Sequence, residues 1–207
     1  MTIARGQPWG REVDRPDDLV AAHDDAELAR LLAAIAHDRS APAAAAAAGD
    51  VARTLGSRDL AGRSRLTELP FDLLDVRLDG QRSVPACAHV VIRSPRRRGG
   101  WWRGRVVIVM NAEFIGDWDV APRGHPNDGR VEIFEVDRSF GMRQRLAARR
   151  RARTATHVPH PAISTRSVKT AAWSFDRSMA VVVDGVRIGT ARSVEVTVLA
   201  DATTVHA

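Results

Sequence analysis

The sequence predicts an α+β, mainly β fold for a chain of 207 residues. Residues 24–37 have the periodicity of one amphipathic helix, whereas short runs of apolar and β-branched residues recur at strand length from about residue 66. We therefore expect a reduced α/β segment at residues 1–64, followed by a mainly antiparallel β-domain at residues 65–207. The length suits one ordinary domain with a fragment of a second.

The first expected element is the helix at residues 24–37. Its apolar residues share one face: Leu28, Leu31, Leu32 and Ile35. Asp24 can cap the first turn, and Glu27 stands three residues later, which is the spacing of a capping box.

Three further segments precede the β-domain. Residues 41–48 are mostly alanine and fit a helix, a linker or a buried strand, because their periodicity does not separate these three. Residues 51–56 predict a short helix that ends at Gly56, and residues 58–65 have the composition of a linker.

The β-domain is expected to contain six strands and one helix. The strands are predicted near residues 71–78, 86–93, 105–112, 130–137, 180–187 and 193–199. The helix is predicted at residues 140–153, where Phe140, Met142 and Leu146 are available for a stripe that faces the core.

Composition excludes several classes of protein. Cys87 is the only cysteine, so neither an intramolecular disulfide scaffold nor a cysteine zinc site is available. No apolar run reaches the roughly 18 residues of a membrane span. The N-terminus has no signal-peptide apolar run, so a cytoplasmic location is expected.

The net charge of +6 is unevenly distributed along the chain. Residues 1–60 carry seven Arg against ten acidic residues, whereas residues 61–207 carry 24 Lys and Arg against 15 acidic residues. The basic character therefore belongs to the β-domain, where it favours contact with anionic partners.

A series of short motifs occurs in a specific order. Residues 106–136 contain Asn111, Gly116, Ala121-Pro122 and Asp128-Gly129; His157 and His160-Pro161 follow the predicted helix, and Asp184-Gly185 comes near the end. In this order the motifs resemble the second domain of the diacylglycerol kinase family of lipid kinases, which includes sphingosine kinases. Upstream, residues 49–56 resemble the start of a family helix, with Asp50 and Arg53 at matching places.

The resemblance implies a β-sandwich-like fold for residues 65–207. It makes residues 1–64 the remnant of a nucleotide-binding domain, and the family's Gly-Gly-Asp-Gly-Thr loop does not occur in the sequence. That loop supplies backbone N–H groups to nucleotide phosphates, for which glycine permits close approach.

The resemblance also implies roles for individual residues. Asp184 would be the general base, Asp128 would belong to a Mg²⁺-linked site, and ATP would be bound near Asp50, Arg53 and Asn111. Val186 stands where the family has Glu, and His125 stands where some members place a second carboxylate. Magnesium prefers oxygen ligands, so His125 argues against an intact site.

A structural alternative exists for these aspartates. Asp-Gly between apolar runs is a strong hairpin-turn signal, and the chain has it at residues 79–80, 128–129 and 184–185. His157 and His160 have a spacing that could hold a metal, but Pro159 and Pro161 place them in a loop without an evident third ligand, so packing roles are favoured.

A basic surface is predicted on the helix at residues 140–153. It carries six arginines and no acidic residue: Arg143, Arg145, Arg149, Arg150, Arg151 and Arg153. We expect Arg143, Arg149, Arg150 and Arg151, together with Trp101 and Trp102, to attract anionic lipid at the inner membrane face. The alternative is a solvated helix face and a core-anchoring Trp pair. Nucleic acid is disfavoured, because no recognition motif accompanies the charge.

Two hypotheses of function remain open. The first is a degenerate lipid kinase homologue related to ATP-dependent phosphorylation of a lipid hydroxyl, with a partner chain that could supply the missing nucleotide domain. The second is a non-catalytic protein that keeps the second domain and binds an anionic lipid or a partner protein. The missing phosphate loop favours the second, because phosphoryl transfer depends on positioning and electrostatics.

Overall fold

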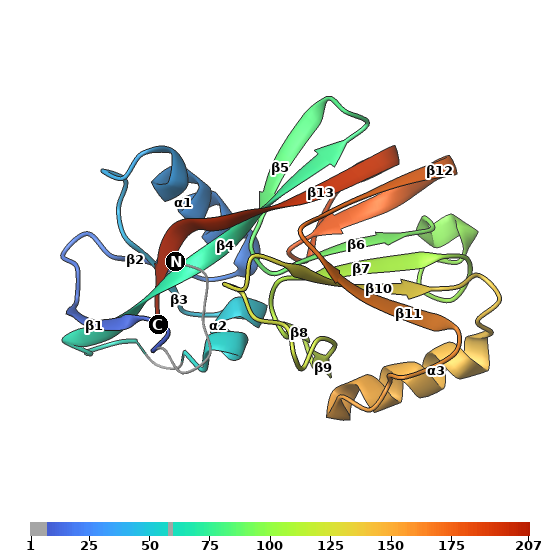
Figure 1. Cartoon of the computed structure of the whole chain (residues 1–207), viewed down its shortest axis with the longest axis horizontal. Coiled ribbons are helices and arrows are strands. Elements are labelled where there is room, and N and C mark those ends of the chain that lie inside the picture. The colour runs from blue at the N-terminus through green and yellow to red at the C-terminus, as the bar shows by residue number, and fades with distance from the viewer. Residues whose placement is uncertain (1–7, 58–59) are drawn as a thin grey trace.

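The structure, a computed structural model, describes residues 8–57 and 60–207 and has the predicted α+β, mainly β fold (Figure 1). The N-terminal elements are β1 (Arg11–Asp14), β2 (Val20–Ala22), α1 (Asp25–His37), β3 (Ala44–Ala46) and α2 (Gly49–Leu55). Strands β2 and β3 pair in parallel with α1 between them, so these elements form a small β-α-β unit.

Helix α1 confirms the predicted helix and its cap. Asp24 accepts a hydrogen bond from the Glu27 N–H at 2.7 Å, and the Glu27 carboxylate accepts one from the His23 N–H at 2.8 Å. Leu28 and Leu32 are fully buried against the sheet. The Asp24 cap and the apolar face therefore act as the sequence pattern predicts, whereas Glu27 accepts the N–H of His23 in place of that of Asp24, so the reciprocal bond of a capping box is not formed.

The alanine-rich run, for which three conformations were open, contains strand β3. All three of its residues are fully buried, with Ala44 and Ala46 in one apolar cluster and Ala45 in another. Small side chains suit a short strand covered on both faces. The predicted helix at residues 51–56 is α2, which ends at Gly56 with a φ of 67°. Part of the predicted linker, residues 58–59, lies outside the described residues.

Most of the chain forms one large sheet. Its remaining strands are β4 (Arg65–Leu78), β5 (Arg82–Ala86), β6 (His89–Arg93), β7 (Val106–Met110), β10 (Val131–Val136), β11 (Ile163–Val168), β12 (Thr170–Val183) and β13 (Val186–His206). The strand order is β1-β4-β13-β12-β6-β7-β10-β11, and β5 pairs with β4. The strands enclose a core in which side chains of β4, β12 and β13 meet those of β6, β7 and β10, which gives the predicted sandwich-like arrangement.

Strand β13 joins the β-α-β unit to this sheet. Its residue His206 pairs in parallel with Ala45, and the His206 ring lies 3.2 Å from the Ala44 carbonyl oxygen. Figure 1 shows β13 running from the β-domain to β3 beside α1, at the end of the molecule opposite α3.

Two predicted strands were wrong in one respect, because each contains a turn. Residues 86–93 divide into β5 and β6 around Cys87 and Ala88, and residues 180–187 divide into β12 and β13 around Asp184-Gly185. Cys87 and Ala88 continue the apolar composition, so it does not reveal the first turn, whereas Asp184-Gly185 is the hairpin-turn signal that the sequence offers as an alternative. Asp184 and Gly185 have φ values of 46° and 78°, which reverse the chain.

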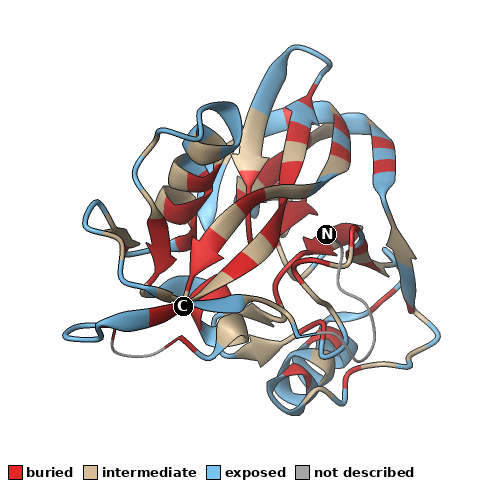
Figure 2. Ribbon diagram, turned by 60° about the vertical axis from the view of Figure 1, so that its left-hand side comes forward, coloured by how far each residue is buried: buried red, intermediate tan, exposed pale blue. Residues whose placement is uncertain are grey.

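Helix α3 (Met142–Arg151) confirms the predicted helix, and a 3-10 turn (Ala152–Thr154) extends it. The prediction of its inward face was partly wrong. Phe140 is buried, but Met142 and Leu146 are 56% and 41% exposed, and Arg145 is buried instead. Figure 2 shows the largely exposed surface of this helix. The helix turns this face inward because buried Arg145 donates hydrogen bonds to backbone carbonyls.

No helix among residues 8–57 and 60–207 combines the length and the apolar character that a membrane crossing needs.

Candidate functional site

Asp184 lies in the turn between β12 and β13 and is 5% exposed. Its carboxylate accepts three backbone N–H groups at 2.9 Å, from Cys87, Ala88 and His89. Burial raises the pKa of Asp184 to about 7, against these three hydrogen bonds, which lower it. The side chain therefore connects the β12–β13 turn to the β5–β6 turn, and a carboxyl with this pKa could also exchange a proton near neutral pH.

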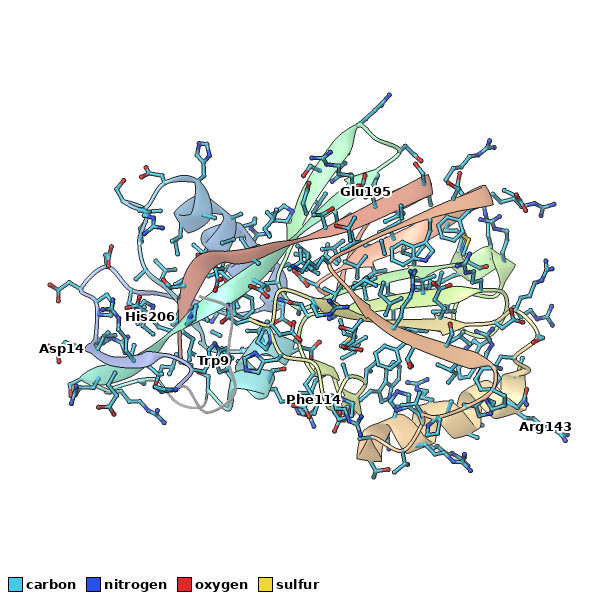
Figure 3. The ribbon with its side chains drawn as sticks, in the orientation of Figure 1. Trp9, Asp14, Phe114, Arg143, Glu195 and His206 are labelled. Carbon is cyan, nitrogen blue, oxygen red and sulfur yellow. The ribbon has the colours of Figure 1, made fainter. Side chains whose placement is uncertain are left out.

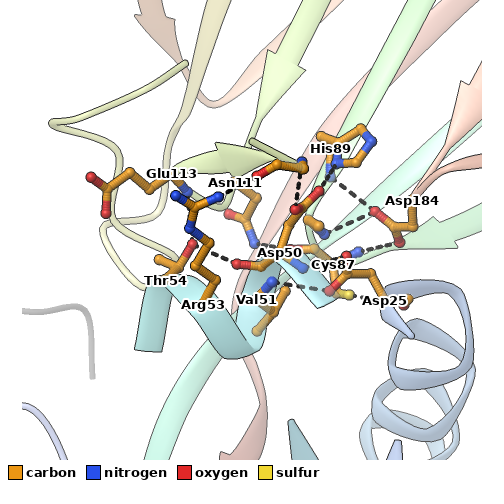
Figure 4. Close-up of polar contacts among 12 residues, drawn as sticks. Asp25, Asp50, Val51, Arg53, Thr54, Cys87, His89, Asn111, Glu113 and Asp184 are labelled. Carbon is orange, nitrogen blue, oxygen red and sulfur yellow. Dashed lines mark hydrogen bonds and ion pairs between the residues drawn. The ribbon is translucent and has the colours of Figure 1, made fainter. Parts of the chain in front are cut away.

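Asp50 lies in the first turn of α2 and faces the same cluster (Figure 4). One of its carboxylate oxygens accepts the Gly116 N–H at 2.7 Å, and the other lies 3.4 Å from Nδ1 of His89. Burial raises the pKa of Asp50 to about 6 and lowers that of His89 to about 4. The imidazole is therefore neutral near neutral pH, and the Asp50 contact is not an ion pair there.

Asp25, which is not among the predicted site residues, is the third carboxylate of the cluster. Its oxygens accept the N–H groups of Asp50 at 2.7 Å and Val51 at 3.0 Å, so Asp25 caps α2 from α1. Burial raises the pKa of Asp25, and its charge in turn raises those of Asp50 and Asp184. The available signal was its place at the start of the predicted helix, directly after Asp24.

The turn between β2 and α1 is where a strand leads into a helix, the context in which the family carries its glycine loop. Here the residues are His23, Asp24 and Asp25. The Glu27 N–H is taken by Asp24, and the His23 N–H is taken by Glu27. The helix N-terminus is therefore capped by the chain's own carboxylates, which also repel phosphate.

Arg53 and Asn111, the other predicted nucleotide-binding residues, are engaged with the protein. The Arg53 guanidinium donates to the Gly116 carbonyl and lies 4.0 Å from the centre of the Phe114 ring. Asn111 is buried, and its Nδ2 donates to the carbonyls of Asp72 at 3.0 Å and Cys87 at 2.8 Å. The structure thus brings Asn111 and Asp50 to the Asp184 cluster, with Arg53 beside them (Figure 4).

Asp128, the predicted metal residue, belongs to a neighbouring group around the buried Asp72. Its carboxylate accepts the Arg130 N–H at 2.9 Å, and burial raises its pKa. His125 accepts the Asn127 N–H at 3.2 Å and packs against Trp9 with a ring-centre distance of 4.2 Å. Among residues 8–57 and 60–207, no three or more His, Cys, Asp or Glu residues are grouped so that they could hold a metal ion.

An apolar cavity of about 110 Å³ lies between α3 and the outward faces of β7 and β10. Its lining includes Ile108, Phe134 and Phe140, and three indole rings: Trp101, Trp102 and Trp118. Trp118 belongs to β9 (Trp118–Asp119), which pairs with β8 (Phe114–Ile115) in a separate short hairpin. The predicted residues Trp101 and Trp102 therefore line a cavity next to α3.

Of the predicted arginines, Arg149 lines this cavity, whereas Arg143, Arg150 and Arg151 are not among its lining residues. Arg149 lies over the rings of Trp118 and Trp102, at 4.7 and 5.9 Å from their centres. Arg143, Arg150 and Arg151 are exposed, and Arg143 projects from α3 away from the sheet (Figure 3). Arg145 is the exception, because its buried guanidinium donates to the carbonyls of Phe140, Trp101, Gly104 and Asp137.

His157 also lines this cavity. The ring is buried, its centre lies 5.8 Å from that of Phe134, and burial lowers its pKa. His160 lies elsewhere, with its ring centre 4.7 Å from that of Phe140. Both rings make aromatic packing contacts.

Comparison with known proteins identifies the fold. No protein family model matches the sequence, and no curated protein matches it. A solved structure of a diacylglycerol kinase from Bacillus anthracis str. Sterne is 16% identical, with a TM-score of 0.61 over 91% of this chain and 75% of that chain. A structure from the same organism, of a protein assigned as a diacylglycerol kinase, is 15% identical, with a TM-score of 0.64 over 91% and 77% of the two chains. The chain therefore has a diacylglycerol kinase-like fold.

Proposed function

We propose that this protein binds an anionic lipid without phosphorylating it. The apolar cavity beneath α3 would take part of the lipid chain, and the arginines of α3 would contact the head group. The observation that carries the proposal is the position of Arg149, which lies at an apolar cavity and over two of its indole rings. An apolar space beside a cation suits an amphiphile with a negative head group.

The outer surface of α3 supports the same proposal. Arg143, Arg150 and Arg151 are exposed on it, and the helix has no acidic residue. Met142 and Leu146 are exposed one helical turn apart, so apolar side chains stand among the cations. This combination is typical of helices that lie in the interface of an anionic membrane, which would place the protein at the inner membrane face.

The cluster around Asp184 supports the non-catalytic part of the proposal. Asp184 is enclosed, and both of its oxygens accept backbone N–H groups. Asp24, Asp25 and Glu27 place carboxylates at the strand-to-helix turn, where a nucleotide phosphate would otherwise approach. Phosphate binding there would require overcoming both the occupied N–H groups and like-charge repulsion.

The test is cosedimentation with vesicles of mixed anionic and neutral phospholipid. Replacing Arg149, Arg150 and Arg151 by Gln should weaken binding about tenfold or more, because each cation near such a surface contributes about 1 kcal/mol. Binding should also weaken with added salt.

A matched control removes the same charge elsewhere, by replacing the exposed Arg30, Arg39 and Arg192 by Gln. Near wild-type binding of this control supports a local surface on α3. An equal loss in both triple variants, or unchanged binding of the α3 variant, would contradict the proposal.

The second candidate is an ATP-dependent lipid kinase, and the cluster of Asp25, Asp50 and Asp184 favours it. Raised pKa values are common among catalytic groups, and a carboxyl with a pKa of about 7 suits general base catalysis. Such an enzyme would use Asp184 as base, Asp50, Arg53 and Asn111 near ATP, and Asp128 near Mg²⁺, and it would need a partner chain to supply a phosphate-binding loop.

Calorimetry of Mg-ATP binding, with and without anionic vesicles, distinguishes the two candidates. Micromolar affinity would support the kinase and would justify assays of lipid phosphorylation. No binding at millimolar ATP, together with vesicle binding through α3, would support the lipid-binding protein.

A further inference from the structure

We infer that Asp50 and Arg53 are positioning residues for the β8–β9 hairpin, which forms one wall of the apolar cavity and controls passage of a ligand into it. The inference rests on the proposed lipid-binding function. It gives these two residues a role in holding the hairpin, in place of the nucleotide contacts that the family resemblance implies.

The hairpin has little structure of its own. Its two strands share only the pairs Phe114 with Asp119 and Ile115 with Trp118, and it pairs with no strand of the large sheet. A two-stranded hairpin of this size is not stable in water by itself. External contacts must therefore hold it in place.

Helix α2 supplies these contacts on one side. The Gly116 N–H donates to Asp50 at 2.7 Å, and the Gly116 carbonyl accepts from Arg53, so both backbone groups of this turn residue are held. The Arg53 guanidinium also covers the Phe114 ring at 4.0 Å. The Glu113 N–H also donates to the Thr54 hydroxyl oxygen at 3.0 Å. Three side chains of α2 thus contact residues 113–116 and hold them in place.

The other side of the hairpin reaches the cavity. Trp118 stands two residues after Gly116, lines the cavity, and packs edge-on against Trp101 with a ring-centre distance of 5.9 Å. Arg149 of α3 lies 4.7 Å from the centre of the Trp118 ring. Because the hairpin is short, a shift of Gly116 away from α2 would carry Trp118 out of the cavity wall. Asp50 and Arg53 therefore hold the wall closed from α2.

The first test measures hydrogen exchange of the backbone amides of residues 113–119 in the protein without ligand. The variant is Arg53→Met, which keeps the side-chain length but removes the guanidinium. Exchange in this segment should accelerate about tenfold, because the variant removes a charge-assisted hydrogen bond. Exchange in β4 and β13 should stay at the wild-type rate.

The second test measures dissociation of cis-parinaric acid, a fluorescent fatty acid, by stopped flow. Arg53→Met should release the probe several-fold faster than the wild type. Arg30→Met is the matched control, since Arg30 is exposed on α1, away from the hairpin, and it should leave both measurements unchanged. Thr54→Val gives an independent variant of nearly equal volume, and it should change both measurements in the same direction by a smaller factor.

The outcomes separate the inference from the proposed function. Unchanged exchange at residues 113–119 in both Arg53→Met and Thr54→Val would overturn the positioning role, whatever the ligand. Faster exchange with unchanged probe dissociation would overturn control of the cavity. Failure of the wild type to bind the probe or anionic vesicles would overturn the proposed function, while the exchange measurement would still decide whether α2 holds the hairpin.

Discussion

Asp184 and Asp79 show how one residue type in one kind of turn takes two environments. Both precede a glycine, both have positive φ, and both accept backbone N–H groups from another segment. Asp79 is exposed, and hydrogen bonds with the N–H groups of Ser193 and Arg192 lower its pKa. Asp184 is enclosed, and burial raises its pKa to about 7. Burial, rather than the local motif, distinguishes the two carboxylates.

Asp184→Asn should lower the free energy of unfolding by about 1–3 kcal/mol, because the amide leaves one buried N–H facing another donor. Urea unfolding measures this change, and Asp79→Asn is the matched control. The control should cost less than about 1 kcal/mol, because water can replace the lost bond and Asn tolerates positive φ. Equal stability of Asp184→Asn and wild type would show that the hydrogen bonds accepted by the Asp184 carboxylate do not stabilise the fold.

At the scale of elements, one charged side chain, Arg145, connects α3 to two neighbouring loops. The Arg145 guanidinium is buried and donates to four backbone carbonyls, in the loop before α3 and in the loop that carries Trp101. The helix can therefore expose Met142 and Leu146 and still stay in place. Arginine suits this role, since its planar group carries five donors.

Arg145→Met should lower the free energy of unfolding by at least about 2 kcal/mol, because several buried carbonyls lose their donor. Arg143→Met removes the same charge from an exposed position of α3 and should change stability by less than about 0.5 kcal/mol. Thermal or urea unfolding of the two variants checks the difference. Similar stability of both would show that α3 is held by its apolar contacts alone.

At the scale of the whole molecule, the buried carboxylates make stability depend on pH. Burial raises the pKa of Asp184 to about 7 and that of Asp50 to about 6, above their values in an unfolded chain. Between the unfolded and the folded pKa of each group, the folded state therefore binds more protons than the unfolded state. The stability that these groups contribute is lost as the pH rises through their folded pKa values. Groups with lowered pKa act in the opposite direction. Glu135 does so only at low pH, whereas His89, whose pKa burial lowers from 6.5 to about 4, does so between these two values.

Above about pH 6.5, where His89 is neutral in both the folded and the unfolded state, the urea midpoint should accordingly fall up to about pH 8. Asp184→Asn should flatten this dependence, because the variant cannot titrate. A midpoint that rises over this range would contradict the raised pKa values. A wild-type slope in Asp184→Asn would assign the dependence to other groups.

The sequence determined the elements whose signals are local. The Asp24 cap, the Gly56 stop and the helix at residues 140–153 all depend on contacts within a few residues, and the structure confirms them. The order of short motifs also predicted the diacylglycerol kinase-like fold, which the structural neighbours share. The division at residue 65 and the roles of Asp184, Asp128, Asp50, Arg53 and Asn111 stay predictions.

Which side chains meet depends on contacts between distant parts of the chain. Asp25 accepts the Asp50 N–H, and Cys87 hydrogen-bonds to both Asp25 and Asp184; these residues are far apart in the chain, and no local pattern encodes such contacts. The inward face of α3 depends on Arg145. Its hydropathy predicts exposure to solvent, but it is buried because it donates hydrogen bonds to the distant carbonyls of Trp101 and Gly104. Burial sets the pKa of each carboxylate and the partners of each arginine, and burial is a property of the whole fold.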